Sequence, residues 1–177
     1  MTSDCYPWLV ARARDELGIA ARFVELAPSP DAPEPGPTAV AVATAIAAAH
    51  EPIVLAHSVG CRAALMAAAA LDEGQTLPAL ICLAGWFTVD RPWPSIVPWL
   101  DPALFDLGRA RAHVRELAAV ISDDDPFTAD HAATRASFER LGARVTLVSG
   151  GRHFNHPEEP AAWDAVAAAV AAIRAAR

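Results

Sequence analysis

The sequence predicts a single α/β domain built on a doubly wound, mostly parallel sheet with helices on both faces. Short apolar runs alternate along the chain with longer segments of helical periodicity. The runs are rich in Val, Ile and Leu without a polar residue at every second position, which is typical of parallel strands covered on both faces. The length of 177 residues is enough for one core and too small for two domains.

Five runs are expected to be strands, and six segments are expected to be helices. The strands are residues 21–26, 52–56, 79–83, 117–121 and 144–148. The helices are residues 6–17, 39–49, 60–71, 109–116, 128–141 and 158–176. Because a predicted helix separates each pair of successive strands, the pattern indicates right-handed βαβ units.

Two segments interrupt this alternation. Residues 28–37 are rich in proline and are expected to form a stiff surface loop. Residues 85–105 contain Trp86, Trp93 and Trp99 together with four prolines. This insertion is predicted to be either a lid or substrate wall, or a satellite hydrophobic cluster attached to the core, and the sequence leaves both open.

Charge and cysteine usage narrow the classes of partner. The net charge of −7, without a cluster of Lys or Arg, argues against nucleic acid and against an anionic membrane surface. No run approaches the about 20 apolar residues that cross a bilayer, and the first six residues lack the pattern of a secretory signal. Cys5, Cys61 and Cys82 do not have the spacing of a disulfide framework or a metal site. We therefore expect a cytoplasmic protein that binds no metal, nucleic acid or membrane.

The most informative local feature is the run IVLAHSVG at residues 53–60, an apolar strand that leads through a tight turn into a helix. This context fits a nucleophile elbow, in which a serine between small residues is exposed at the start of a helix. Gly60 supplies one small residue, and Ala56 stands where glycine is usual. The elbow predicts Ser58 as the nucleophile and the backbone N–H of Val59 as an oxyanion donor. The motif alone is equally consistent with an ordinary helix N-cap and turn.

Acidic residues and histidines follow two later strands. The run SDDDPF at residues 122–127 follows one predicted strand, and the run SGGRHFNH at residues 149–156 follows the next. Because the carboxyl ends of parallel strands meet at one edge of a sheet, these runs are expected to lie close to the elbow. The order Ser, Asp, His is that of an α/β-hydrolase triad. The residues themselves leave open which of the three aspartates, and which of His153 and His156, takes part.

Substrate contacts are predicted beside the nucleophile. The side chain of His57 points away from that of Ser58 in an elbow, so His57 is expected to flank the nucleophile and contact the substrate, not to serve as its base. Trp86 and Trp93 of the insertion offer an apolar surface for the acyl or alcohol group of a small-molecule substrate.

These motifs resemble those of the small α/β-hydrolases of the YdeN type, a family that includes retinoblastoma-binding protein 9. The resemblance covers nearly the whole chain and is carried by YPWL at residues 6–9, AHSVGC at 56–61, DDPF at 124–127 and GRHF at 151–154. It implies that the acid is Asp125, directly before the proline, and that the base is His153, directly before Phe154. It further implies hydrolysis of small esters, or of amides in some members, through an acyl-enzyme and without a cofactor.

One segment of the family pattern has no counterpart in this sequence. Members of the family begin with a strand and a glycine-rich loop ahead of the helix that residues 6–17 resemble, whereas here only a few residues precede it. The resemblance places that strand between residues 21–26 and residues 52–56, and its loop usually supplies the second oxyanion donor. We therefore expect a chain shortened at its N-terminus, in which the sheet and the oxyanion hole are both incomplete.

Three functions fit this pattern. The first is hydrolysis of small carboxylic esters, or of amides or thioesters, in which Ser58 attacks, His153 carries the proton, Asp125 orients His153 and the Val59 N–H binds the oxyanion. The second is a non-catalytic binding protein that retains these residues and has lost part of its oxyanion hole. The third is acyl transfer by the same residues.

Overall fold

The computed structural model describes residues 5–128 and 130–176 of the chain. Four parallel strands form one sheet in the order β1-β2-β3-β4. The strands are β1 (Ile53–His57), β2 (Leu77–Leu83), β3 (Val114–Ser122) and β4 (Arg144–Val148). The helices are α1 (Tyr6–Leu17), α2 (Pro35–Ala47), α3 (Val59–Ala69), α4 (Leu107–Ala112), α5 (His131–Arg140) and α6 (Pro160–Ala175), with a short 3-10 turn at Val97–Leu100.

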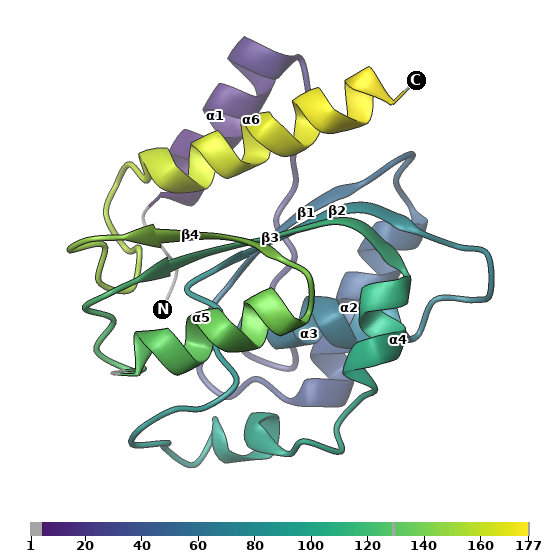
Figure 1. Ribbon diagram of the computed structural model, residues 1–177. Coiled ribbons are helices and arrows are strands. Elements are labelled where there is room, and N and C mark those ends of the chain that lie inside the picture. Colours follow the sequence, from purple (N-terminus) through teal and green to yellow (C-terminus); the bar gives the residue numbers. More distant parts are fainter. Residues whose placement is uncertain (1–4, 129, 177) are drawn as a thin grey trace.

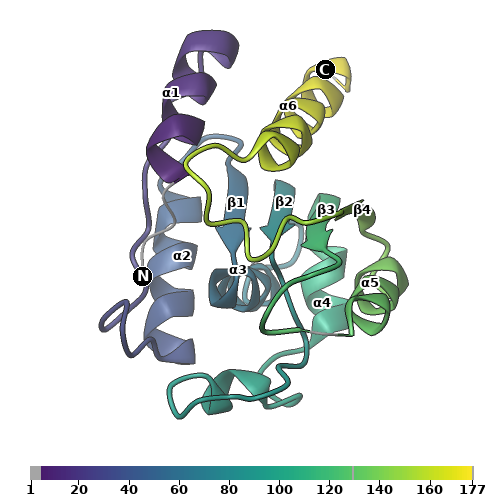
Figure 2. The same ribbon diagram turned by 90° about the vertical axis from the view of Figure 1, so that its left-hand side faces the viewer.

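Helices cover both faces of the sheet, as Figures 1 and 2 show. Helices α1 and α6 lie on one face, and α2 to α5 lie on the other. Successive strands are connected through α3, α4 and α5 in turn. The predicted α/β class, with a parallel sheet between two helical layers, is confirmed.

Strand β2 shows why its sequence is continuously apolar. All seven of its residues are buried. Alternate side chains enter opposite layers, because successive residues of a strand point to opposite faces. Leu80 and Cys82 pack in the cluster that contains Phe138 of α5, whereas Ile81 packs in the cluster that contains Trp163 of α6.

The prediction of a strand at residues 21–26 is wrong. Residues 18–26 are irregular, and Phe23 is 57% exposed. A strand needs a neighbour to pair its backbone N–H and C=O groups, and the described residues provide no strand between this segment and β1. The strand that the YdeN resemblance places there is thus not among the described residues, and β1 forms an edge of the sheet.

Other differences concern boundaries. The predicted helix at residues 109–116 divides, because α4 ends at Ala112 and residues 114–116 already pair in β3. Strand β2 begins two residues earlier than predicted, and α2 begins at Pro35 instead of residue 39. No helix in the described ranges is long and apolar enough to span a membrane.

The insertion at residues 85–105 packs onto α3. Trp86, Ile96 and Trp99 form a buried cluster with Val59 and Ala63. The indole N–H of Trp99 also donates to the carbonyl of Pro33 at 3.0 Å. The segment therefore includes the satellite cluster that was one of its two predicted forms; its role as a lid or substrate wall stays a prediction.

Candidate active site

Ser58 lies in the sharp turn between β1 and α3. Its backbone has φ 54° and ψ −123°, a conformation that residues with a Cβ rarely adopt. The N–H of Ser58 donates to the carbonyl of Leu83 at 2.9 Å, which ties the turn to the end of β2. The strand, turn and helix thus have the arrangement expected of a nucleophile elbow, with the Ser58 side chain at the start of α3.

The small residues around Ser58 are not equally constrained. Ala56 is buried, as expected for a position where the chain closes tightly. A Cβ added at Gly60, however, would meet no heavy atom within 4 Å. The expectation that residue 60 must be small is therefore wrong for the described structure, because no neighbouring group approaches α3 at that point.

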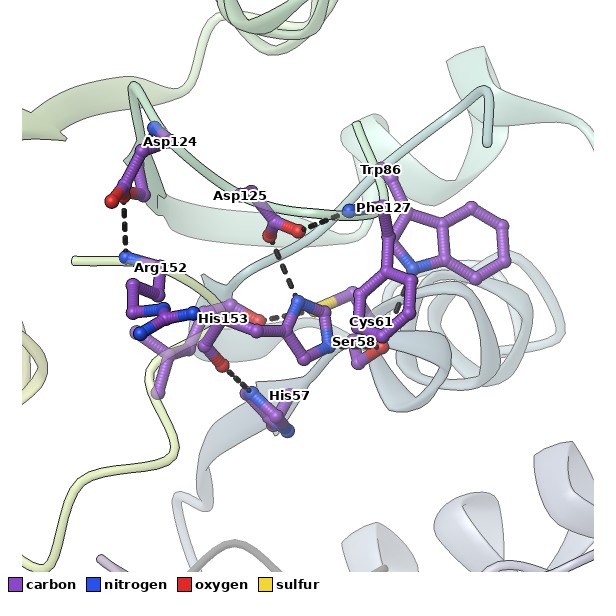
Figure 3. Close-up of polar contacts among 11 residues, drawn as sticks. His57, Ser58, Cys61, Trp86, Asp124, Asp125, Phe127, Arg152 and His153 are labelled. Atoms are coloured by element: carbon purple, nitrogen blue, oxygen red, sulfur yellow. Dashed lines mark hydrogen bonds and ion pairs between the residues drawn. The ribbon is translucent and has the colours of Figure 1, made fainter. Parts of the chain in front are cut away.

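Figure 3 shows a continuous hydrogen-bonded chain from Asp125 through His153 to Ser58. Oδ2 of Asp125 lies 2.8 Å from Nδ1 of His153, and Nε2 of His153 lies 3.0 Å from Oγ of Ser58. Because the Asp125 carboxylate only accepts, Nδ1 of His153 carries the hydrogen and Nε2 is free to accept from Ser58. Asp125 and His153 are 6% and 8% exposed, so the hydrogen bond between them is largely shielded from water.

The three aspartates after β3 separate into different tasks. Asp125 alone contacts the His153 ring, and its Oδ1 accepts from the N–H of Phe127 at 2.9 Å. Asp123 accepts from the N–H of Gly150, and this hydrogen bond holds the pKa of Asp123 below its usual value. Asp124 accepts from the hydroxyl of Ser122 and from the backbone N–H of Arg152, which lies in the loop of residues 149–156 after β4, the histidine loop. These hydrogen bonds likewise lower the pKa of Asp124.

His153, and not His156, is the histidine beside Ser58. The ring of Phe127 packs edge-on against that of His153, with centroids 4.6 Å apart. His156 is exposed, and its backbone N–H donates to the carboxylate of Glu159 at 2.9 Å. The structure therefore brings together the acid and the histidine that the resemblance implied.

The three residues predicted to contact substrate lie around Ser58 in different ways. The indole N–H of Trp86 points at Oγ of Ser58 at 3.4 Å, and Trp86 is buried. Trp93 is 42% exposed and packs against Phe127. The His57 ring already forms a hydrogen bond within the protein, since its Nε2 lies 2.8 Å from the backbone carbonyl of His153. Their contacts with a substrate stay predictions.

Sequence reasoning did not assign a role to Phe127 or to the segment that faces it. A cleft of about 300 Å³ is lined by Val89, Asp90, Arg91, Pro126 and Phe127. The N–H of Asp90 donates to the carbonyl of Phe127 at 3.1 Å. This hydrogen bond joins the insertion to residues 123–128 after β3, the acid loop. The DDPF motif drew attention to Phe127, but its packing against His153 became visible only in the structure.

The predicted oxyanion donor, the N–H of Val59, lies at the start of α3. The N–H of Val59 is the first of the helix, and such N–H groups have no acceptor within the helix. The helix dipole adds partial positive charge at the same place. The loop that the YdeN resemblance implies as the second donor has no counterpart in the part of the chain that the structure describes.

Cys61, three residues after Ser58 in α3, lacks the properties of a reactive thiol. Its Sγ donates to the carbonyl of Ala56 at 3.2 Å, and burial raises the pKa of the thiol well above its usual value. Low-pKa cysteines are the nucleophilic ones, so Cys61 is expected to be inert. Within the described ranges, no group of three or more His, Cys, Asp or Glu residues has the arrangement of a metal site.

His57 should make the stability of the protein sensitive to acid. Burial, and next electrostatic repulsion from His153, lower the pKa of His57 from 6.5 to about 4. As the pH falls through this window, the unfolded chain takes up a proton that the folded chain does not, so folding becomes less favourable by up to about 3 kcal/mol. Urea unfolding at about pH 7 and about pH 4.5 measures the loss. His57→Gln cannot titrate and should lose less; an equal loss in both proteins would contradict this assignment.

Comparisons with known proteins bear on the family and the fold. The chain matches the serine hydrolase family over residues 16–172. It is similar to the crystal structure of the ydeN gene product of B. subtilis, with 22% identity and a TM-score of 0.79, over 94% of this chain and 90% of that one. No curated protein matches the chain. The structural likeness shows the α/β fold, and the family match covers most of the sequence. The chain therefore belongs to the serine hydrolase family.

Proposed function

We propose that this hydrolase cleaves small carboxylic esters through an acyl-enzyme formed on Ser58. The observation that carries the proposal is the hydrogen-bonded chain from Asp125 to Ser58, with distances of 2.8 and 3.0 Å. It lies at the carboxyl ends of β1, β3 and β4, where the strands bring the three residues to one edge of the sheet. Such a chain supplies a nucleophile, a base and an orienting carboxylate.

Each group has a distinct step in the reaction. Oγ of Ser58 attacks the acyl carbon while Nε2 of His153 takes the hydroxyl proton. The carbonyl oxygen becomes an oxyanion that accepts from the N–H of Val59. When the intermediate collapses, the C–O bond to the alcohol breaks and His153 returns the proton to the leaving oxygen. Water, deprotonated by His153, then attacks the acyl group and releases the acid, which restores Ser58.

The surroundings favour a small, partly apolar substrate. Trp86 lies directly beside Oγ of Ser58, and the cleft near Phe127 holds about 300 Å³. Amides and thioesters would follow the same steps with nitrogen or sulfur as the leaving atom. We also place the protein in a reducing compartment such as the cytoplasm, because Cys5, Cys61 and Cys82 are an odd and widely spaced set that does not fit a disulfide framework.

A binding protein without turnover is the second candidate. One observation favours it: among the described residues the sheet has no strand beyond β1, the place where the YdeN resemblance puts the strand whose loop supplies a second oxyanion donor. Loss of a single oxyanion donor lowers turnover by about 10²–10³. A protein that lacks one oxyanion donor would still bind its ligand in the pocket and would turn it over too slowly to act as an enzyme.

Labelling by a fluorophosphonate probe separates the two candidates. The probe phosphorylates an activated serine, so the parent protein should be labelled, Ser58→Ala should not, and His153→Ala should be labelled far more slowly. Ser137→Ala, which removes a half-buried hydroxyl on α5 away from Ser58, is the matched control and should react like the parent. A folded parent that resists labelling, or labelling that survives Ser58→Ala, would favour the binding protein.

A further inference from the structure

The run of three aspartates binds three positions of one loop. Asp123 accepts from the N–H of Gly150 at 2.9 Å, and Asp124 accepts from the N–H of Arg152 at 2.7 Å. Asp125 accepts from the ring of His153. The proposed reaction uses only Asp125, so the other two carboxylates need a separate account.

The same loop is held from the opposite direction by β1. Nε2 of His57, the last residue of β1, lies 2.8 Å from the backbone carbonyl of His153. Because a carbonyl only accepts, Nε2 of His57 carries the hydrogen and donates it. The two rings also pack edge-on, with centroids 5.0 Å apart. In Figure 3, His57 and the acid loop contact the histidine loop from two sides.

This loop needs support from outside. Arg152 and Phe154 have φ of 48° and 51°, values that cost free energy for residues with a Cβ. Such conformations persist only where the surroundings hold them. Strand β4, which precedes the loop, has five residues, none of them fully buried. The hydrogen bonds from neighbouring elements, together with the buried side chain of Phe154, therefore hold the loop in this conformation.

Asp124 is itself held in place. The hydroxyl of Ser122, a buried residue at the end of β3, donates to Oδ1 of Asp124 at 2.6 Å. The N–H of Arg152 donates to the same oxygen. Asp124 thus connects the end of β3 to the residue directly before His153.

We propose that His57 and Asp124 are positioning residues that keep the ring of His153 aligned for proton transfer. This inference rests on the proposed function, and it gives His57 a role different from the predicted substrate contact. His57 fixes the carbonyl end of His153, and Asp124 fixes the N–H of Arg152, the residue before it. Displacement of a reacting group by about 1 Å is enough to cost about 100-fold in rate.

Paired variants separate positioning from folding. His57→Phe removes the donor and retains a ring, whereas His57→Gln offers a new N–H donor. Asp124→Ala removes the acceptor, whereas Asp124→Asn retains Oδ1, which accepts both hydrogen bonds. With p-nitrophenyl acetate, we expect kcat to fall about 10- to 100-fold in the Phe and Ala variants, with KM changed less than about twofold. The Gln and Asn variants should recover a large part of kcat.

A second measurement does not depend on turnover. The Nδ1 proton of His153 gives a downfield NMR signal while it is held by Asp125, and the ¹⁵N shifts of the ring report its tautomer. Both should be lost or broadened in His57→Phe and Asp124→Ala and should persist in the conservative variants. If the parent proves inactive, the proposed ester hydrolysis fails, and this signal alone decides the positioning roles.

Three results would overturn the inference. They are unchanged kcat and an unchanged His153 signal in both disruptive variants, losses that the Gln and Asn variants do not recover, and losses that follow the unfolding temperature across all four variants. Asp124 is exposed, so Asp124→Ala keeps the test decisive even if His57→Phe does not fold.

Discussion

Asp125→Asn should lower kcat by about four orders of magnitude while the protein remains folded. The two carboxylate oxygens of Asp125 have different donors, since Oδ1 accepts from the N–H of Phe127 and Oδ2 accepts from Nδ1 of His153. An asparagine that keeps the Phe127 contact must present its NH₂ group to His153. Nδ1 would then have to accept, and the ring hydrogen would move to Nε2, where it blocks removal of the Ser58 proton.

The measurement is kcat for an aryl acetate, together with the rate of fluorophosphonate labelling. Asp164→Asn, on the surface of α6, makes the same chemical change away from the site and serves as the control. The urea midpoints of both variants should remain close to that of the parent. A decrease of less than about tenfold would show that Asp125 does not orient the base, because a wrong tautomer costs far more.

Trp99→Ala should lower the free energy of unfolding by about 3–5 kcal/mol, a large part of the stability of an ordinary domain. Trp99 is 0% exposed and belongs to the cluster that packs the insertion onto α3. Alanine would leave a cavity and would also leave the carbonyl of Pro33 without its indole donor. The buried cluster that also contains Trp86 would lose packing.

Urea unfolding with linear extrapolation measures this effect. Trp93→Ala is the matched comparison, because Trp93 belongs to the same insertion and is 42% exposed. Its cost should stay within about 1 kcal/mol. Similar losses in the free energy of unfolding for the two variants would mean that the buried cluster around Trp99 contributes little to stability.

The sequence predicted the parts of the fold whose pattern is local. Strand β2 is covered on both faces, so its apolar run was distinct, and the runs after β3 and β4 had to meet the elbow once the strands were parallel. Residues 21–26 were also predicted as a strand and form none, because pairing depends on a neighbour that the run itself does not contain.

The same limit applied to the site. The positions of the strands predicted that an acidic run and a histidine-containing run would meet Ser58, and the YdeN resemblance implied Asp125 and His153 within those runs. The contact of His57 with a carbonyl 96 positions away, and that of Asp124 with an N–H 28 positions away, left no local trace in the sequence. These hydrogen bonds depend on the orientation of two loops, which only the folded chain defines.

The backbone of Ser58 has a consequence for the evolution of this chain. Glycine adopts φ 54° without a steric penalty, whereas serine at this position carries a cost on the order of 1 kcal/mol. A chain selected only for stability would therefore drift towards glycine at residue 58 and lose its hydroxyl. Serine at this position is therefore a compromise between stability and the proposed activity, because the strained residue of the turn is also the one that we propose as the nucleophile.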